Sequence, residues 1–408
     1  MQPPSLSRKS WDSLPSEIRL LIFQSLRQDG SKLACLAAVS RAWQADLERY
    51  NFTRIKLTPS RLVDFRSMIR RNQALVRYIW FSLELDDYDC THCAPRSVDD
   101  TEHCPITASF QGLFSILSEW DKDSKLMLDI SIYSPSDAQH WFPYLTFVSD
   151  NPFDKPEGSG IEPTTYIYGL EYLSLFESIR HGHYHLKKLV SFENFNQQYP
   201  VFMQQFLFGE DLRGCDSIRI PTPAVGRTIA QTSLPLEHLA ASFIIEASHF
   251  FAIDPSWGWL NLTSLVLTSR LLTPEENSTK IDALLQAAAV AALRMPRLET
   301  MEIWNGQKGL AALFQYRVIR GLKQTRILWR GTWKYHISPS VLQAWEAVGH
   351  LHDSWRLDVV QEQVEESAIQ SHGDALHHLM LSGQAIRSVS LQQIRREQKS
   401  LEGVEILP

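Results

Sequence analysis

Cysteine and histidine side chains gather in one acidic stretch of the sequence, DDYDCTHCAPRSVDDTEHC. Its Cys-x-x-Cys pair has the spacing with which zinc sites supply two ligands, and a His-Cys pair follows. The residues that could bind a zinc ion are Cys90, Cys93, His103 and Cys104. His103 and Cys104 are adjacent, which is poor geometry for two ligands of one ion, although a longer loop could use His92. Because Asp and Glu surround these residues, we predict an exposed acidic loop and no metal.

A second group of histidines, HGHYH, places His181, His183 and His185 at the two-residue period of a strand. Three imidazoles on one face could bind a metal, but the nearby sequence offers no fourth ligand and no orienting carboxylate. Motifs of nucleotide-binding loops, serine hydrolases and zinc proteases are absent from the chain. We therefore predict a polar strand or turn at these histidines, no cofactor and no enzymatic activity.

The composition is that of an ordinary globular protein: 408 residues, of which 44% are apolar and 21% charged. A net charge of −6 argues against a protein that mainly binds nucleic acid. The first residues, MQPPSLSRKSWD, lack the apolar core of a signal peptide, and no apolar run reaches the length of a membrane span. We therefore expect no membrane partner, a cytoplasmic or nuclear location, and five cysteines in reduced form.

Three short helices are expected to follow a disordered N-terminus. In the first helix, Pro15 suits the first helical position, and Glu17 lies where the helix dipole favours a carboxylate. Ser31 and Ser40 can cap the second and third helices. Such short helices are not stable alone, so they must pack on each other or on a partner.

The first of these helices, SEIRLLIFQSL, is apolar on two sides. At about 100° per residue, one stripe consists of Leu14, Ile18, Leu21, Ile22 and Leu26. Leu20 and Phe23 lie on the opposite side. Two apolar faces require two packing surfaces, and the following segment LACLAAV can provide one of them. The other could come from the rest of the chain or from another protein, and periodicity alone favours the former.

After Tyr50 the sequence changes to strands that alternate with helices. An apolar spacing of the form Leu-x-x-Leu-x-Leu predicts strands that begin near residues 52, 76, 170, 215, 236, 262, 298 and 322. The segment LMLDISIY, residues 126–133, is a further alternating strand. The recurrence indicates an α/β fold, in which an irregular leucine-rich-repeat-like solenoid of strands and helices follows the N-terminal helices. The alternative is a generic α/β domain whose buried strands are rich in Leu.

The predicted helices of this region cover residues 60–75, 110–120, 273–295 and 338–348. The third begins with Thr273 as cap and Pro274 at the first helical position, and Ser338 and Pro339 have the same roles in the fourth. The last residues look like one or two polar helices and a strand-like tail.

Three aromatic-rich segments, WNGQKG, LWRGTWKYH and DPSWGWL, fall at or near predicted strand ends. Trp, Tyr and Arg often dominate the binding energy of protein interfaces, so these loops could bind a partner. We favour the interpretation that their Trp side chains fill the core between repeats.

The N-terminal stretch WDSLPSEIRLLIFQSL, with the later LACLAAVSRAW, resembles the F-box motif. That motif opens with Leu-Pro-x-Glu-Ile/Leu and ends with Val-Ser/Cys-Arg/Lys-x-Trp. The matching residues are Trp11, Leu14, Pro15, Glu17, Ile18, Ile22, Phe23, Leu26, Leu33, Leu36, Val39, Ser40, Arg41 and Trp43. In its order of elements, the rest of the chain is similar to fungal F-box proteins, in which a long strand-helix region follows the F-box.

The resemblance implies a three-helix F-box that docks on the SKP-type adaptor of an SCF-type ubiquitin ligase, and through the adaptor on a cullin. The repeat domain would hold an unknown protein substrate near the ubiquitin-loaded enzyme, so that other subunits perform the chemistry. The residues expected to bind the adaptor are Trp11, Leu14, Pro15, Ile18, Leu20, Ile22, Phe23 and Leu36. Trp43 is expected in the core, where it would hold the third helix on the first.

The expected domains are a disordered N-terminus at residues 1–10, an F-box at 11–50, a leucine-rich-repeat-like domain at 51–360 and a C-terminal helical tail at 361–408. The function that this organisation favours is that of a substrate-recognition subunit. The alternative is a non-catalytic interaction scaffold that does not direct ubiquitination.

Overall fold

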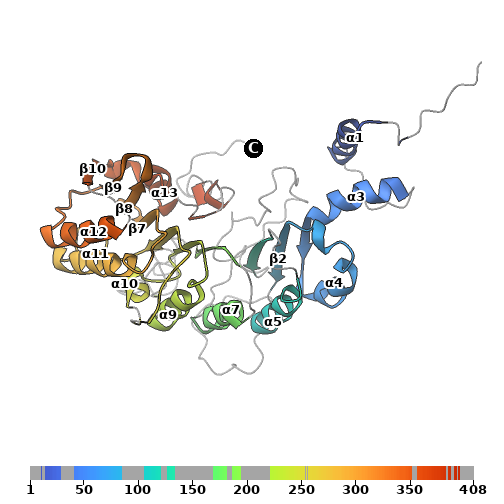
Figure 1. Cartoon of the computed structure of the whole chain (residues 1–408), viewed down its shortest axis with the longest axis horizontal. Helices are drawn as coiled ribbons and strands as arrows, with labels where there is room; N and C mark the ends of the chain where they lie inside the picture. Colours follow the sequence, from blue (N-terminus) through green and yellow to red (C-terminus); the bar gives the residue numbers. More distant parts are fainter. Residues whose placement is uncertain are drawn as a thin grey trace, which may run out of the picture. The chain divides into compact units, whose positions relative to one another are not determined.

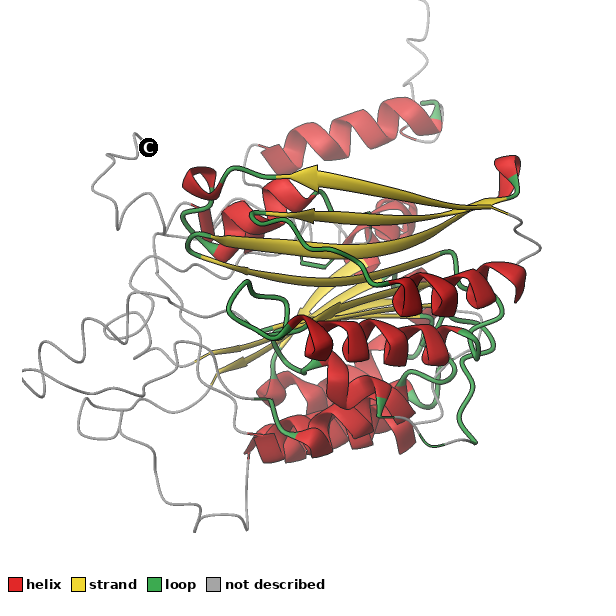
Figure 2. Cartoon of the chain, turned by 90° about the vertical axis from the view of Figure 1, so that its left-hand side faces the viewer, coloured by secondary structure: helices red, strands yellow, loops and turns green. Residues whose placement is uncertain are grey.

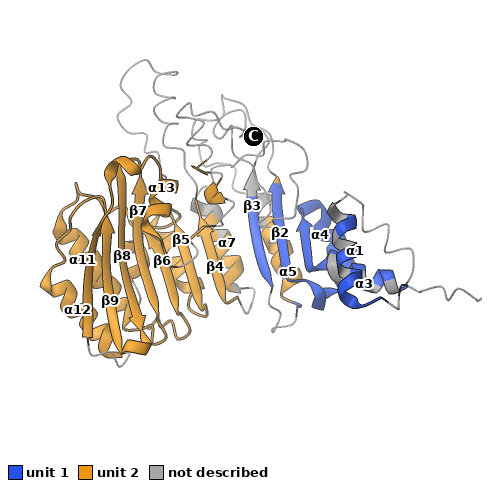
Figure 3. Ribbon diagram, turned by 90° about the horizontal axis from the view of Figure 1, so that it is seen from above, with its two compact units in different colours: residues 1–83, 119–131 blue, residues 84–118, 132–408 orange. Residues whose placement is uncertain are grey.

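The chain divides into two compact units (Figure 3). One unit comprises residues 1–83 and 119–131, and the other comprises residues 84–118 and 132–408. The computed structural model describes residues 11, 14–28, 41–84, 105–120, 126–133, 169–181, 186–193, 221–252, 254, 256–351, 356–382, 385–386, 390–392 and 394–395. The predicted domain boundaries at residues 50 and 360 both fall inside elements, the first in a helix and the second in a strand.

The first unit combines helices with a three-stranded sheet of order β1-β2-β3. Its elements are α1 (Ser16–Gln28), α3 (Arg41–Thr53), β1 (Arg54–Leu57), the 3₁₀ helix η2 (Pro59–Arg61), α4 (Leu62–Ile69), the 3₁₀ helix η3 (Gln73–Leu75), β2 (Tyr78–Glu84) and β3 (Met127–Tyr133). Strands β1 and β2 are parallel. Across this sheet Lys56 lies over the ring of Trp80, and the indole N–H of Trp80 donates to the Ser131 hydroxyl at 3.0 Å.

The second unit is built on a seven-stranded sheet of order β10-β9-β8-β7-β6-β5-β4 (Figure 1). Its strands are β4 (Lys188–Phe192), β5 (His238–Ser242), β6 (Ser264–Thr268), β7 (Thr300–Gln307), β8 (Leu310–Ile319), β9 (Gln324–Gly331) and β10 (Arg356–Gln363). Strands β4 to β7 are mutually parallel, β8 is antiparallel to both neighbours, and β10 is parallel to β9. Strands that are consecutive in sequence are therefore neighbours in the sheet throughout.

The second unit also contains the helices that connect these strands. They are α5 (Pro105–Leu117), α7 (Gly169–His181), α9 (Pro223–Thr232), α10 (Ala247–Phe251), α11 (Ser278–Ala292), α12 (Pro339–Leu351) and α13 (His372–Leu379), with short 3₁₀ helices at Arg320–Leu322 and Glu366–Ala368. Figure 2 shows the strands as one layer with helices packed along it. The architecture is thus mixed α/β, as predicted from the alternating pattern.

The Leu-x-x-Leu-x-Leu spacing explains why these strands form and which face they bury. In the β6 segment the three apolar positions are Leu262, Leu265 and Leu267, and all three side chains are fully buried. Leu265 is the register partner of Leu239 on β5 and of Met301 on β7, so the same position of each segment lies in one row. On this face Trp345 of α12 packs against Tyr316 of β8, with ring centroids 4.6 Å apart. We call it the helix-covered face.

Most strands predicted from this spacing are confirmed: those near residues 52, 76, 236, 262, 298 and 322 correspond to β1, β2, β5, β6, β7 and β9. The alternating strand predicted at residues 126–133 corresponds to β3. The strand predicted at residue 170 is wrong, because this segment lies in helix α7. Tyr172, Phe176 and Ile179 are buried there, and they are three or four residues apart, as on one face of a helix. This helical spacing, and not the Leu-x-x-Leu-x-Leu spacing, matches the observed structure of the segment. The segment predicted as a strand from residue 215 lies outside the described residues.

The sequence did not predict three strands of the large sheet: β4, β8 and β10. Strand β8 is buried on both faces from Leu310 to Tyr316, so it has no alternation to reveal it. A tight turn joins it to β7, and Gly309 adopts the left-handed φ of 73° that this turn requires. Part of the predicted C-terminal helical tail is instead the edge strand β10.

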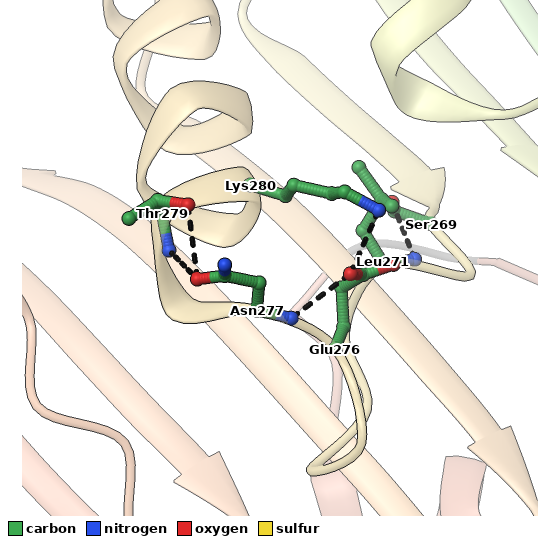
Figure 4. A network of polar contacts seen from close by, with 6 residues as sticks. All are labelled: Ser269, Leu271, Glu276, Asn277, Thr279 and Lys280. Atoms are coloured by element: carbon green, nitrogen blue, oxygen red, sulfur yellow. Dashed lines mark hydrogen bonds and ion pairs between the residues drawn. The ribbon is translucent and has the colours of Figure 1, made fainter.

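The caps of α11 and α12 test the predicted helix starts, and Figure 4 shows the start of α11. Helix α12 begins at Pro339 as predicted, and the Val341 N–H donates to the Ser338 hydroxyl at 3.4 Å. Helix α11 begins at Ser278 and not at Pro274. Its cap is Asn277, whose side-chain oxygen accepts the N–H and the hydroxyl of Thr279, each at 2.9 Å. An amide cap that satisfies two donors outweighs the Thr-Pro signal upstream.

Helix α13 packs on the face of the large sheet opposite the helix-covered face, over β7 and β8. It buries Leu376 and Leu379 against Trp304 and Leu313 in one apolar cluster. His372, at the start of α13, is buried beside Phe192 and Phe243, with ring centroids 6.2 and 5.9 Å away. This end of the sheet therefore has a core on both faces.

We expect Gly306→Ala to destabilise the protein, because Gly306 of β7 lies directly under α13. A Cβ atom at this position would overlap the Cβ of Ala375 and lie 3.2 Å from the Trp304 ring. The expected loss in the free energy of unfolding is about 1–3 kcal/mol, measured by urea unfolding. In Gly321→Ala, where no described atom lies within 4 Å of the new Cβ, the change should stay within about 0.5 kcal/mol. Equal effects of the two substitutions would contradict this packing.

Burial lowers the pKa of His372 to about 3. The unfolded chain takes up a proton on this side chain near its ordinary value of 6.5, whereas the folded chain does not. The free energy of unfolding should therefore decrease as the pH falls from about 6.5 toward 3, by up to about 1.4 kcal/mol per pH unit. His372→Phe should remove this contribution. Urea unfolding of both proteins at pH 7 and pH 5 measures it, and identical pH slopes would refute it.

Candidate functional site

The N-terminal segment with the predicted adaptor-binding residues is held together by two tryptophans. Trp11 precedes α1 and is half-buried, and its ring lies 4.5 Å from that of Trp43 on α3. Trp43 was predicted to hold the third helix on the first, and its described contact is with the residue that leads into the first helix. The carbonyl of Pro15 accepts the N–H groups of Ile18 and Arg19 at 3.1 Å and so starts α1.

Helix α1 leaves apolar side chains in water. Ile18 is 41% exposed and Leu21 is 57% exposed, and their three-residue spacing puts them on one side of the helix. We call Ile18 and Leu21 the α1 patch. Of the other predicted contact residues, Pro15 is exposed, and Leu14 and Ile22 are half-buried. The side chains of Leu20 and Phe23, together with Leu36, lie outside the described residues.

The residues considered as metal ligands are not placed by the structure. Cys90, Cys93, His103 and Cys104 lie outside the described residues, as do His183, His185 and the side chain of His181. In the described part of the chain, no three His, Cys, Asp or Glu side chains are close enough to bind a metal ion. Among the described helices, none has the length and apolar character needed to cross a membrane.

The aromatic segments near strand ends prove to be core elements where they are described. Trp304 and Trp329 lie within β7 and β9 and are buried, and so is Trp259 in the segment before β6. The indole N–H of Trp259 donates to the Ser233 hydroxyl at 2.7 Å. Trp333 is half-buried and packs edge-on against Trp329 at 5.3 Å. The interpretation that these rings fill the core is confirmed for Trp259, Trp304 and Trp329, whereas Trp257 and Trp333 are half-buried.

The face of the large sheet that carries α13 contains a continuous row of polar side chains. Register pairs link one residue from each of the seven strands, and these residues point to the same side of the sheet. They are Lys188, His238, Ser264, Thr300, Arg317, Arg326 and Asp358. We call them the polar row. Because side chains alternate along a strand, the polar row lies opposite the buried Leu239, Leu265 and Met301.

A buried carboxylate lies two residues along from the polar row. Glu302 of β7 is fully buried and accepts the side-chain amide of Gln315 on β8 at 2.6 Å. It also accepts the backbone N–H and the hydroxyl of Ser382, both at 2.8 Å. These donors give the carboxylate the hydrogen bonds that a buried charge requires. Glu302 therefore fastens the segment after α13 to the sheet.

A shallow hollow of about 310 Å³ opens over the polar row. Its floor includes the apolar Val190, Ala240 and Val266, and Ser382 lies at its border. Five members of the polar row line it: Lys188, His238, Ser264, Thr300 and Arg317. The structure thus combines polar side chains with an apolar floor, which is the composition of a binding surface.

The analysis of motifs did not identify the polar row, although its signal is present in the sequence. His238, Ser264 and Thr300 occupy the same third position of three successive Leu-x-x-Leu-x-Leu segments. A polar residue at this position points away from the Leu residues and toward the other face. Arg317 comes from the unpredicted strand β8, so it had no such signal.

We expect Glu302→Ala to release the segment after α13, because Gln315 and Ser382 would lose their acceptor. The expected cost is about 2–3 kcal/mol in the free energy of unfolding, with faster hydrogen exchange at the Ser382 amide. Mass spectrometry of the peptide that contains Ser382 measures the exchange. Glu346→Ala, at an exposed position on α12, is the matched control and should change neither quantity. Unchanged exchange in Glu302→Ala would contradict the fastening role.

Comparison with known proteins places the large sheet in a family. No curated protein matches the chain significantly. Residues 181–387 match the Family of unknown function (DUF6546). This match covers just over half of the 408 residues, and it contains all seven strands of the large sheet and helix α13. The chain therefore belongs to the Family of unknown function (DUF6546).

Proposed function

We propose that the protein is an F-box substrate-recognition subunit of an SCF-type ubiquitin ligase. The observation that carries this proposal is the α1 patch within a segment that matches the F-box motif. Ile18 belongs to the motif, and Leu21 lies on the same side of the helix. Both side chains are exposed in the chain without a partner.

Physical chemistry supports a protein partner for this patch. Fully burying an Ile or Leu side chain stabilises a complex by about 1.5–3 kcal/mol relative to leaving it in water. Two such side chains on one short helix are suited to the groove of a partner, in the manner of an amphipathic helix. The partner we propose is the SKP-type adaptor, which would link the chain to a cullin.

The large sheet supplies the second part of the proposal. Its neighbouring strands β4 to β7 are parallel, consecutive in sequence and separated by helices. We propose that they belong to a leucine-rich-repeat-like solenoid, because such repeats stack parallel strands next to each other. We propose that this unit holds a protein substrate for ubiquitination by other subunits. The chain would then act by bringing two proteins together and would perform no chemistry of its own.

Ile18→Asp and Leu21→Asp should each abolish or weaken adaptor binding by roughly 30-fold or more, because a charge in place of an interface anchor costs about 2 kcal/mol. Both positions are exposed, so the fold should tolerate the substitutions. Co-purification with the recombinant adaptor, followed by titration calorimetry, measures the effect.

Val63→Asp is the matched control for this experiment. Val63 is 84% exposed on α4 of the same unit, so the variant introduces the same charge outside the α1 patch and should bind the adaptor like the wild type. If the wild-type chain does not bind the adaptor, or if all three variants bind equally well, the proposal is wrong. A complex with the adaptor that never contains a cullin would support a scaffold instead.

A further inference from the structure

We propose that the polar row binds an extended, acidic segment of a partner protein. The inference rests on the proposed function only in assuming that this unit holds a protein. Its own support comes from the openness of the polar row, its charge, its hydroxyl groups and its length across the sheet.

The polar row is accessible, whereas α13 covers the central part of the same face. Helix α13 lies over the carboxyl-terminal parts of the central strands and packs against Trp304 and Leu313. The polar row lies at the opposite ends of the parallel strands, beyond Glu302 and Ser382. There the side chains of Lys188, Arg317 and Arg326 are exposed, and those of His238, Ser264 and Thr300 are half-buried. Among the described residues, no helix of the chain covers this part of the sheet.

The polar row has more cationic than anionic side chains, and this excess favours the binding of an anion. Arg317 and Arg326 are register partners on neighbouring strands, so two Arg side chains leave the same face of the sheet next to each other. Like charges opposite each other destabilise a sheet pair unless an anion compensates them. The row contains a single carboxylate, Asp358, and it bonds to Arg326 at 2.9 Å. Among the described residues, Arg317 forms no ion pair of its own.

The carboxylates at the border of the hollow are already compensated. Glu299 lines the hollow but pairs with Arg320 at 3.1 Å. Glu302 is fully buried and occupied by its own donors. A carboxylate from outside would therefore find Arg317 available, and the planar guanidinium group can bind it through two hydrogen bonds. The exposed face thus favours an acidic partner over a basic or a purely apolar one.

The hydroxyl groups of the polar row and its length across the sheet indicate which groups the partner segment offers and how many residues it has. Ser264 and Thr300 stand between the cationic ends of the row and can donate hydrogen bonds to carboxylate or carbonyl oxygens. From His238 to Arg326 the row crosses four strand intervals, and at about 4.8 Å each the distance is about 19 Å. An extended chain advances about 3.3 Å per residue, so roughly six residues cover the row.

The test uses the full chain and a fluorescein-labelled octapeptide in which Glu and Ser alternate. Fluorescence anisotropy should show saturable binding that weakens at least tenfold when the salt concentration rises from about 0.05 M to about 0.5 M. The same peptide with Gln in place of Glu should bind at least tenfold more weakly, because it keeps the length and polarity but lacks the charge.

Arg317→Glu should weaken binding of the Glu peptide at least tenfold. The matched control is Arg227→Glu, which makes the same change at an exposed position on α9 and should alter affinity less than twofold. Circular dichroism of both variants checks that they fold. The inference is overturned if the peptide gives no anisotropy change up to about 1 mM, if Arg317→Glu binds like the wild type, or if the Gln peptide binds equally well. Equally tight binding of a single-stranded oligonucleotide of the same charge would also overturn it.

The outcome is separable from that of the proposed function. The peptide assay contains no adaptor, and Arg317→Glu should still bind the adaptor because Arg317 lies outside the F-box segment. Peptide binding without adaptor binding would leave the acidic-segment inference standing and reject the ubiquitin-ligase role. Adaptor binding without peptide binding would reject the acidic-segment inference and leave the ubiquitin-ligase role standing.

Discussion

The parallel register of strands β4 to β7 is the constraint on which the second unit depends. It aligns the Leu-x-x-Leu-x-Leu segments, so that Leu239, Leu265 and Met301 form one buried row beneath the helices. Because side chains alternate along each strand, this alignment also fixes the other face. The residues between the Leu positions must form rows of their own, and the polar row is one of them. The core and the candidate binding surface therefore have a common cause.

The second constraint is how much of that other face the chain covers with its own residues. Helix α13 covers one end with an apolar cluster around Trp304, and Glu302 fastens the following segment through Ser382. A carboxylate buried in the middle of a sheet is tolerated only because its hydrogen bonds are made. Among the described residues, this cover does not reach the polar row. An open row with adjacent arginines is what makes a partner's acidic segment a physically reasonable occupant.

Sequence reasoning was accurate where one physical signal dominated. The strands of β5, β6 and β7 followed from alternating Leu residues, and the start of α12 followed from Ser338 and Pro339. It was inaccurate where a segment showed two patterns that predict different structures, or showed no pattern at all. The Leu spacing near residue 170 belongs to α7, since Tyr172 and Phe176 pack at the helical period. Strand β8 gave no alternation because both its faces are buried.

The sequence by itself determined the α/β class, the buried face of most strands and the F-box resemblance, because each depends on residues close together in the chain. Only the tertiary structure decided the sheet order, the burial of Glu302 and the assembly of the polar row. Arg317 and Arg326 become neighbours through the antiparallel pairing of β8 with β9, and Lys188 joins His238 across strands separated by helix α9. Such contacts depend on register between distant segments, and local periodicity carries no information about that register.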